Sequence, residues 1–471
     1  MMFSFFSLLF SACSTPPCEC PATDSGISAS DTTAMPDTAV DVDSALPSDS
    51  GESDEEQSRI ASVYLLGGQS NMAGFSQRSG LPPSLRSVQD DVQLYWSGLP
   101  GWRGLSPSSP HSSGYGHFTG PEASFGRLVA NYYPEKNIHL IKHAVSGTDL
   151  YAFWNPGASP DDTSNMGEGY RVFQQTVFDG LAALEAQGFE VRVEGMIWMQ
   201  GESDASYSPY AAAYQENLQN LIARVREDVA TPDMEFIIGK IACTTEMCPD
   251  RNIVRLAQDA VAQEDPLVQT IETEDLERNF DDPWHYTGQS MRVIGMRFAE
   301  ALLGLPQSPL PTPAVQLTGE WRNDYYGNYT VGWSFQLHEP VIVTDIGQID
   351  IELDGLNHDT HLAFWREDTY ELIFEGNIPK AASDSTSLLG YFRSTAIDPF
   401  LLTPGNYIVG LQSFVDNPDW YVYEAVYTAS AEVSHTGYRH SEGSVLAFPW
   451  YAGATGETGA WFGPNFWYIS P

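Results

Sequence analysis

Apolar residues follow two different periods along the chain, and the change of period divides it. Between residues 59 and 304, short continuous apolar runs alternate with longer segments in which apolar residues recur every three to four positions. The runs predict buried strands at 60–66, 138–145, 193–199, 235–242 and 268–272. The periodic segments predict helices at 121–133, 170–187, 207–229, 252–264 and 286–304. Strands and helices in alternation predict an α/β part with a parallel sheet covered on both faces.

Beyond residue 315 helical periodicity gives way to short alternating runs such as VIVTDIGQIDIEL and NYIVGLQSF. This pattern, together with many Tyr, Trp, Thr and Gly residues, predicts an antiparallel β-sandwich as an accessory domain over 316–471. The Pro-rich stretch 305–315 is expected to be a stiff linker between this sandwich and a separate α/β domain over 59–304.

The N-terminal residues fit neither pattern. Residues 1–13 form an apolar run that ends in small residues at Cys13, which resembles a bacterial lipoprotein signal. We therefore expect export and lipid attachment at Cys13, to give a cell-surface or outer-membrane lipoprotein, with a plain secretory signal or an uncleaved apolar tail as alternatives. Residues 14–58 contain no Lys or Arg and predict a disordered acidic linker.

Charge and cysteine content exclude some classes of function. The chain has 62 acidic and 22 basic residues, a formal charge of −40, so it repels phosphate backbones and nucleic-acid binding is not expected. Cys243 and Cys248 lie five positions apart after a predicted strand, and in an oxidising compartment they predict a local disulfide. The Cys and His spacing offers no support for a metal site.

Three residues of hydrolytic chemistry lie far apart in the sequence. Ser70 follows the first predicted strand, in GGQSNMAG, and DDPWHYTG places Asp282 and His285 three positions apart before the last predicted helix. A serine hydroxyl needs a base to take its proton, and a carboxylate to orient that base. Asp281, adjacent to Asp282, is an alternative orienting acid. A capping or turn serine is the alternative reading of Ser70.

Two further segments supply donors for an oxyanion. Gly147, in KHAVSGTDL, follows a predicted strand, and a glycine there lets a backbone N–H approach a developing negative charge. Gln200, in WMQGESD, follows another strand and offers a side-chain amide. A turn glycine and a satisfied polar residue at a strand end are the alternatives for these two positions.

The order of these blocks resembles the SGNH/GDSL hydrolase superfamily. GQSNM, GPE, SGT, WMQGESD and Asp-x-x-His together resemble its sialate O-acetylesterase-type branch, which includes carbohydrate esterase family six, the acetyl xylan esterases. The resemblance implies a flavodoxin-like α/β/α fold and hydrolysis of sugar O-acetyl groups through an acetyl-serine, without metal or cofactor.

By the same resemblance Ser70 is the nucleophile, His285 the base and Asp282 its orienting acid. The N–H groups of Ser70 and Gly147 would form the oxyanion hole with the Gln200 side chain. Glu122 of GPE and Glu202 of QGESD match family positions as well, and we expect both to hold loops, with Glu202 also a candidate for contact with substrate.

The predicted function is a carbohydrate O-acetylesterase acting on an acetylated polysaccharide or on sialic acid. The alternatives are an SGNH esterase or lipase of broader specificity and a carbohydrate-binding surface protein. In the C-terminal part, exposed aromatic side chains would bind sugar rings, whereas buried ones would fill the sandwich core. The candidates are Trp420, Tyr421, Trp450, Tyr451 and Trp461.

Overall fold

The computed structural model describes residues 59–107, 118–279, 282–322, 327–380, 387–389, 391–416, 419, 421–453 and 462–471. All of them belong to one compact unit, Glu52–Pro471. The predicted signal segment, Cys13 and the acidic linker lie outside these residues, so export and lipid attachment stay predictions. Within the described ranges, none of the helices has the length and apolar character needed to cross a membrane.

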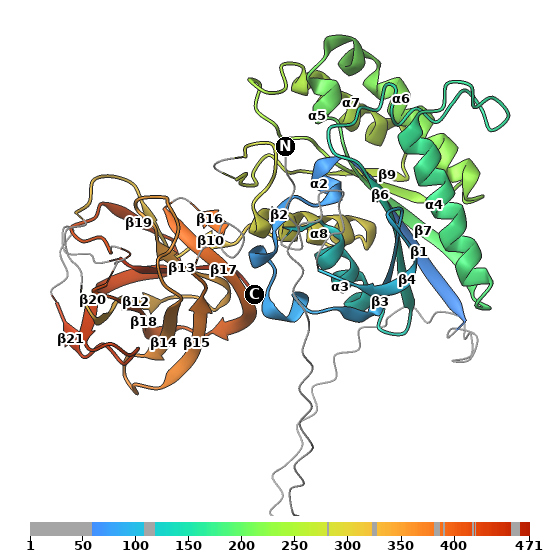
Figure 1. Ribbon diagram of the computed structural model, residues 1–471. Coiled ribbons are helices and arrows are strands. Elements are labelled where there is room, and N and C mark those ends of the chain that lie inside the picture. Colours follow the sequence, from blue (N-terminus) through green and yellow to red (C-terminus); the bar gives the residue numbers. More distant parts are fainter. Residues whose placement is uncertain are drawn as a thin grey trace, which may run out of the picture. The chain divides into compact units, whose positions relative to one another are not determined.

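A seven-stranded sheet organises the α/β part, in the order β4-β3-β6-β1-β7-β8-β9 (Figure 1). Its strands are β1 (Ile60–Gly68), β3 (Gln89–Trp96), β4 (Leu99–Leu105), β6 (Asn137–Ala144), β7 (Glu190–Met199), β8 (Glu235–Gly239) and β9 (Val268–Ile271). The six strands β3-β6-β1-β7-β8-β9 are parallel, and the five strands β6-β1-β7-β8-β9 have the flavodoxin-like order, which confirms the predicted fold. The sheet is not wholly parallel, because β3 and β4 form an antiparallel hairpin at one edge that the apolar runs did not predict.

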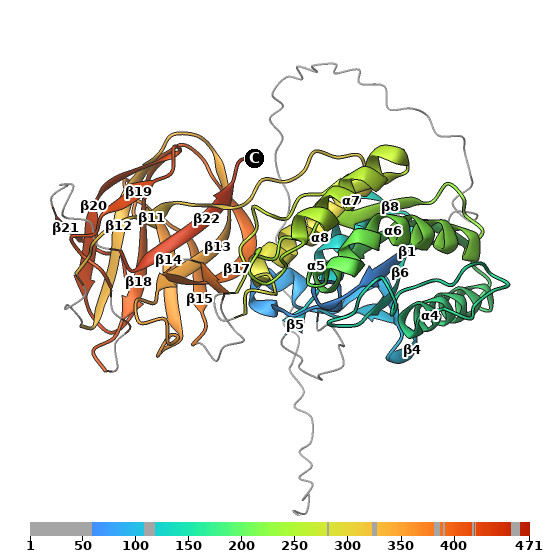
Figure 2. The same ribbon diagram turned by 90° about the horizontal axis from the view of Figure 1, so that it is seen from above.

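Helices cover both faces of this sheet (Figure 2). The apolar faces of α4 (Glu168–Glu185), α6 (Ser208–Asp228) and α7 (Arg251–Glu264) pack in one core cluster with Trp154 and Trp198. The second face carries α3 (Glu122–Tyr132) and α8 (Gly288–Leu302), which share a separate cluster with Phe125 and Phe298. Strand residues contribute alternately to the two clusters, as expected for a sheet buried on both sides.

The carboxyl end of β1 is shaped by glycine. Gly68 has a φ of +148°, and a Cβ added to it would lie 2.1 Å from the Met199 carbonyl oxygen of β7. Only glycine therefore lets the chain leave the sheet between β6 and β7 and enter the one-turn helix α2 (Ser70–Ala73). In parallel sheets ligands bind at this edge, where the strand order reverses.

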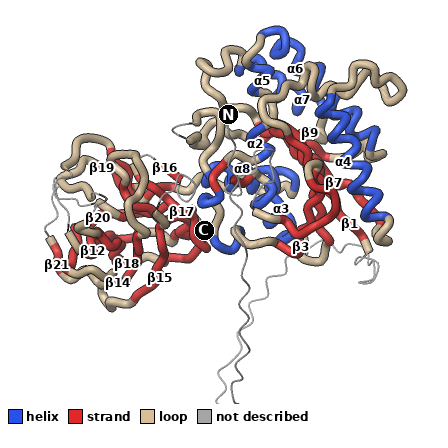
Figure 3. The backbone as a smooth tube through the Cα atoms, in the orientation of Figure 1, coloured by secondary structure: helices blue, strands red, loops and turns tan. Residues whose placement is uncertain are grey.

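The C-terminal part is an antiparallel β-sandwich, as predicted (Figure 3). One sheet contains β10 (Thr312–Pro313), β22 (Pro464–Ile469), β13 (Val341–Ile349), β17 (Phe392–Leu402) and β16 (Ser387–Leu389). The other contains β15 (Leu372–Ile378), β14 (Thr360–Arg366), β18 (Gly405–Ser413), β12 (Tyr329–Leu337), β20 (Val433–Glu442) and β21 (Tyr451–Ala452). Their inner faces share an aromatic core in which Trp333 lies parallel to Phe466, with ring centroids 5.9 Å apart.

A buried ion pair joins the α/β part to the sandwich. Arg292 of α8 donates from Nη2 to Oδ2 of Asp345 in β13 at 2.7 Å, and the two side chains are only 8% and 1% exposed. Arg86 adds bonds from Nη2 to the Thr395 hydroxyl and the Ala396 carbonyl, at 2.8 and 3.0 Å. A buried charge strongly destabilises the folded state when its partner is removed, so each member of this pair needs the other.

Asp345→Asn is expected to lower the free energy of unfolding by about 3 kcal/mol or more, because it leaves the Arg292 guanidinium buried without its counter-charge. Denaturant unfolding at pH 7 measures the change. The control is Asp91→Asn, which breaks the exposed Arg127–Asp91 pair (27% and 58% exposed) and is expected to cost less than about 1 kcal/mol. Equal effects of the two substitutions would contradict the argument.

Candidate active site

Ser70 is the first residue of α2, directly after β1, and is 7% exposed. Because it begins a helix, its backbone N–H has no carbonyl one turn earlier to bind. Among the described residues this N–H has no hydrogen-bond acceptor. The nucleophile position predicted from the sequence therefore combines a hydroxyl with a free backbone donor.

The side chain of Asn71 connects Ser70 to the two other predicted segments. Its Nδ2 donates to Glu202 Oε1 at 2.8 Å and to the Trp284 carbonyl at 3.2 Å. Glu202 belongs to the QGESD segment, and Trp284 immediately precedes His285. The structure therefore brings the three segments together around one buried amide.

His285 and Asp282 form the predicted acid–imidazole pair. His285 Nδ1 lies 2.5 Å from Asp282 Oδ2, and the side chains are 14% and 45% exposed. Phe75, five residues after Ser70, stacks on the imidazole with ring centroids 4.7 Å apart and an interplanar angle of 15°. Asp281 lies outside the described residues. No hydrogen bond joins Ser70 to His285 in the described part of the chain, although this contact commonly tightens only once substrate is bound.

Gly147 lies exposed in the loop after β6, with a φ of +69°. A Cβ added there would meet nothing within 4 Å, so the glycine is required by its left-handed backbone rather than by lack of space. Its N–H has no acceptor within the ranges that the structure covers. The second predicted oxyanion donor is thus available.

Gln200 does not offer the free amide that the sequence suggested. It is fully buried, and its Nε2 donates to Asp204 Oδ2 at 2.6 Å and to the Thr148 carbonyl at 3.0 Å. Burial raises the pKa of Asp204 to about 6, against the opposing effect of the bond from Gln200. The Gln200 side chain therefore ties the loop after β6 to the loop after β7, because both of its N–H groups already have acceptors.

Glu122 and Glu202 are both buried, and each anchors a neighbouring segment. Glu122 Oε2 pairs with Lys142 Nζ at 2.7 Å, and Lys142 also donates to the Ala73 carbonyl, at the end of α2, at 3.1 Å. Burial lowers the pKa of Lys142, and Glu122 opposes the shift. Burial raises the pKa of Glu202, whose second oxygen, Oε2, has no partner in the described structure.

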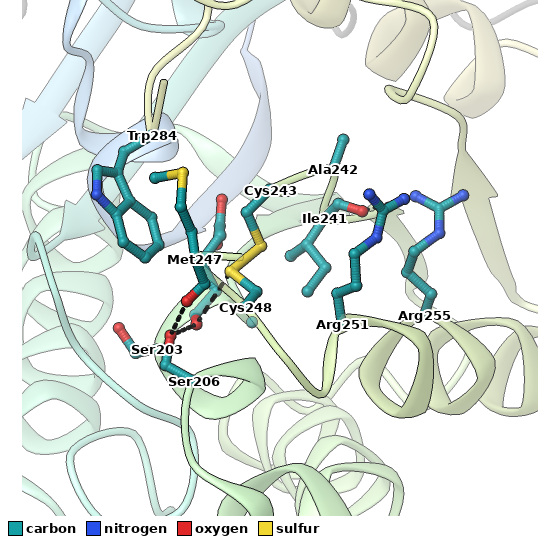
Figure 4. Close-up of a disulfide and its surroundings, with 12 residues drawn as sticks. Ser203, Ser206, Ile241, Ala242, Cys243, Met247, Cys248, Arg251, Arg255 and Trp284 are labelled. Atoms are coloured by element: carbon teal, nitrogen blue, oxygen red, sulfur yellow. Dashed lines mark hydrogen bonds between the residues drawn. A yellow bond between two sulfur atoms is a disulfide. The ribbon is translucent and has the colours of Figure 1, made fainter. Parts of the chain in front are cut away.

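The disulfide Cys243–Cys248 closes the loop after β8 (Figure 4). This loop follows the carboxyl end of its strand, as the loops after β1 and β7 do. Cys248 Sγ lies 3.7 Å from the Glu202 carbonyl, and the Ser206 hydroxyl donates to the Met247 carbonyl at 3.3 Å. Trp284, 40% exposed, is one of the residues around this loop (Figure 4). Within the residues described, no three His, Cys, Asp or Glu side chains are grouped so as to hold a metal ion.

The family of carbohydrate esterases described as sialic acid-specific acetylesterases matches residues 60–304, just over half of the chain. The chain belongs to this family. The match spans every segment of the site above, from the end of β1 to α8. No curated protein matches the sequence.

Solved structures similar to this family member share little sequence with it. A protein from Arabidopsis thaliana is 21% identical, with a TM-score of 0.43, over 52% of this chain and 98% of its own. A carbohydrate acetylesterase from Xanthomonas citri is 16% identical, with a TM-score of 0.40, over 77% of this chain and 74% of its own. NanS is 14% identical, with a TM-score of 0.40, over 52% of this chain and 97% of its own.

Two residues of the site escaped sequence reasoning. Lys142 lies inside an apolar strand run, where a lysine gives no sign of being fully buried beneath α2. Gln69 precedes Ser70, and its Oε1 accepts weakly from the N–H groups of Gly201 and Ser203, both at 3.4 Å. Its position inside the family's GQSN block was the available signal.

Asn71→Ala is expected to reduce kcat for a small acetyl ester by about 10- to 100-fold, because small misplacements of reacting groups are costly. It should also lower the free energy of unfolding by about 1–3 kcal/mol, since Glu202 loses its side-chain partner. Steady-state kinetics and denaturant unfolding measure the two effects. Asn131→Ala, at an exposed asparagine of α3, is the control: it removes only an exposed bond from Arg127 Nε, so kcat should stay unchanged and the free energy of unfolding should fall by less than about 1 kcal/mol. Full activity in Asn71→Ala would contradict the joining role of this amide.

Proposed function

We propose that the protein is a serine esterase that removes O-acetyl groups from carbohydrates through an acetyl-Ser70 intermediate. The observation that carries the proposal is the Asp282–His285 pair, held next to the nucleophile helix by the bond from Asn71 to the Trp284 carbonyl. Membership of a carbohydrate esterase family supports the sugar ester as substrate.

In the proposed first step, His285 Nε2 takes the proton of the Ser70 hydroxyl while Oγ attacks the acetyl carbonyl carbon. Asp282 accepts the hydrogen bond from Nδ1–H, which fixes the tautomer and stabilises the imidazolium that forms. The carbonyl oxygen becomes negative and binds the free N–H groups of Ser70 and Gly147. Gln200 contributes by holding the loop that carries Gly147, because its amide donates to the Thr148 carbonyl. Its second partner, Asp204, accepts from the Leu150 N–H of the same loop.

In the second step the C–O bond to the sugar breaks, and His285 returns its proton to the leaving alcohol. A water molecule then gives a proton to His285 and attacks the acetyl-serine, and acetate leaves as Ser70 recovers its hydroxyl. The cycle consumes one water and needs no electron acceptor. A broader esterase or lipase of the same mechanism is the rival, and acetyl and octanoyl esters separate the two by their relative kcat/KM.

Ser70→Ala is expected to lower acetate release from an acetylated glycan by at least about three orders of magnitude, because the nucleophile is lost. Asp282→Asn should lower it by about two to four orders of magnitude, since the amide cannot hold the same tautomer. Acetate assays on purified protein measure both, with thermal unfolding as a check of folding.

Asp281→Asn is the matched control, because it changes the adjacent acid while leaving the contact of Asp282 with His285. It should retain most of the activity. An active Ser70→Ala variant would overturn the mechanism, and a greater loss in Asp281→Asn than in Asp282→Asn would exchange the two acids.

A second candidate function, sugar binding by the β-sandwich, is supported by an exposed aromatic cluster. Tyr370 and Trp450 are 56% and 63% exposed, with ring centroids 5.1 Å apart, and both contact Phe448. Tyr370 has a φ of +62°, which is strained for a bulky residue. Tyr451 is also exposed, whereas Tyr421 is buried in the core. Trp420 and Trp461 lie outside the described residues.

Trp450→Ala in the full chain, combined with Ser70→Ala to prevent turnover, should weaken retention on insoluble acetylated xylan by about three- to tenfold. A binding isotherm by depletion of free protein measures it. The control is Leu401→Ala, which removes an apolar side chain of β17 that is 56% exposed. Equal binding by the two variants would remove the support for this function.

A further inference from the structure

Three tyrosines outside the apolar core form a ring cluster in the α/β part. Tyr151 and Tyr210 are stacked face to face, with centroids 4.4 Å apart and an interplanar angle of 9°. Tyr207 meets Tyr210 edge to face at 4.8 Å and 86°. Tyr151 and Tyr207 are 45% and 56% exposed, and none of the three belongs to the apolar core clusters. Aromatic rings in such pairs are rigid, flat and partly exposed to solvent, which suits them for binding a ligand rather than for core packing.

The cluster is attached to two loops that lead to the candidate active site. Tyr151 lies four residues after Gly147, and Tyr207 and Tyr210 follow the QGESD segment. The Asp204 carboxylate ties the two loops together, because it accepts from the Leu150 N–H at 2.9 Å and from the Gln200 amide at 2.6 Å. Tyr207 N–H donates to the Asp204 carbonyl at 3.1 Å. The rings are thus fixed to the two loops that carry the Gly147 donor and its support.

The charges around the site favour a neutral ligand. Carboxylates of Asp149, Glu202, Asp204 and Asp282 all lie on the segments that build it. On the neighbouring segments Arg251 pairs with Glu274 and Arg255 pairs with Glu272, whereas Arg278 donates to the Ala242 carbonyl. On these segments carboxylates outnumber guanidinium groups, so an anionic sugar such as sialic acid would meet a net negative field.

We propose that Tyr151, Tyr207 and Tyr210 form a stacking subsite for a neutral sugar unit adjoining the acetylated one. The substrate is then a neutral acetylated oligosaccharide or polysaccharide chain. This proposal rests on the proposed esterase function and specifies its substrate. The exposed face of Tyr151 and the ring of Tyr207 contact the apolar face of the sugar, while the acetyl group reaches Ser70.

The test compares a chain substrate with a small ester. In Tyr151→Ala/Tyr207→Ala, KM for acetylated xylo-oligosaccharides is expected to rise about tenfold, from two lost ring contacts, with kcat nearly unchanged. The kcat/KM for 4-nitrophenyl acetate should stay the same, because this ester is too small to reach the subsite. That unchanged value also shows that the variant is folded. Tyr151→Phe/Tyr207→Phe keeps the rings and should keep the wild-type KM.

The matched control is Tyr132→Ala. Tyr132 is 47% exposed and meets Tyr133 edge to face at 4.8 Å and 86°, nearly the geometry of Tyr207 on Tyr210. It ends α3, whose first residue contacts Lys142 near the carboxyl end of β6, so Tyr132 lies toward the opposite edge of the sheet. Its substitution should leave both substrates unaffected.

Unchanged KM for the oligosaccharides in the double alanine variant would overturn the subsite, with the esterase function intact. Wild-type protein that releases acetate from O-acetyl sialic acid faster than from xylo-oligosaccharides would overturn the neutral substrate. Failure of the esterase function itself would be seen earlier and differently, as wild-type protein that hydrolyses neither the glycans nor 4-nitrophenyl acetate.

Discussion

One side-chain amide holds together the segments on which the proposed chemistry depends. Asn71 donates to Glu202, 131 residues away, and to the Trp284 carbonyl, 213 residues away. Each bond is buried or partly buried, where an unpaired polar group costs free energy, so neither contact is lost without penalty. The helix with the serine, the loop after β7 and the loop with the histidine are therefore fixed with respect to one another before any ligand arrives.

The shortness of α2 explains why so many buried polar groups surround it. A helix of four residues satisfies few of its own backbone groups and is unstable alone. Lys142 donates to the last carbonyl of α2 and is paired with Glu122. The Asn71 side chain, within α2, joins the helix to the neighbouring loops. The unsatisfied N–H of Ser70 at the other end is the group that an oxyanion would bind. The unpaired N–H that makes a short helix unstable is thus the same group that the proposed reaction needs as an oxyanion donor.

Much of this arrangement was readable from the sequence, because strands buried on both faces are continuous apolar runs and the site blocks follow them directly. The Asp282–His285 spacing favoured their contact but left Asp281 as an alternative acid, and the structure shows Asp282 at His285 Nδ1. The β3–β4 hairpin was missed because Gln89–Trp96 mixes exposed acids with apolar residues and has an irregular register. The state of Gln200 depends on Asp204 and Thr148 meeting its amide in space, and no local pattern encodes that meeting. Lys142 was missed for the same reason.

The ion pair between Arg292 and Asp345 has a consequence for how such proteins evolve. Arg292 lies on the helix that begins three residues after His285, and its counter-charge is encoded 53 residues later, in the sandwich. Recombination that joined this α/β part to another module would leave the Arg292 guanidinium buried without a counter-charge, unless the new module placed an acid opposite it. The two halves are therefore expected to be inherited as a pair, and relatives with different C-terminal modules should carry an uncharged residue at the position of Arg292.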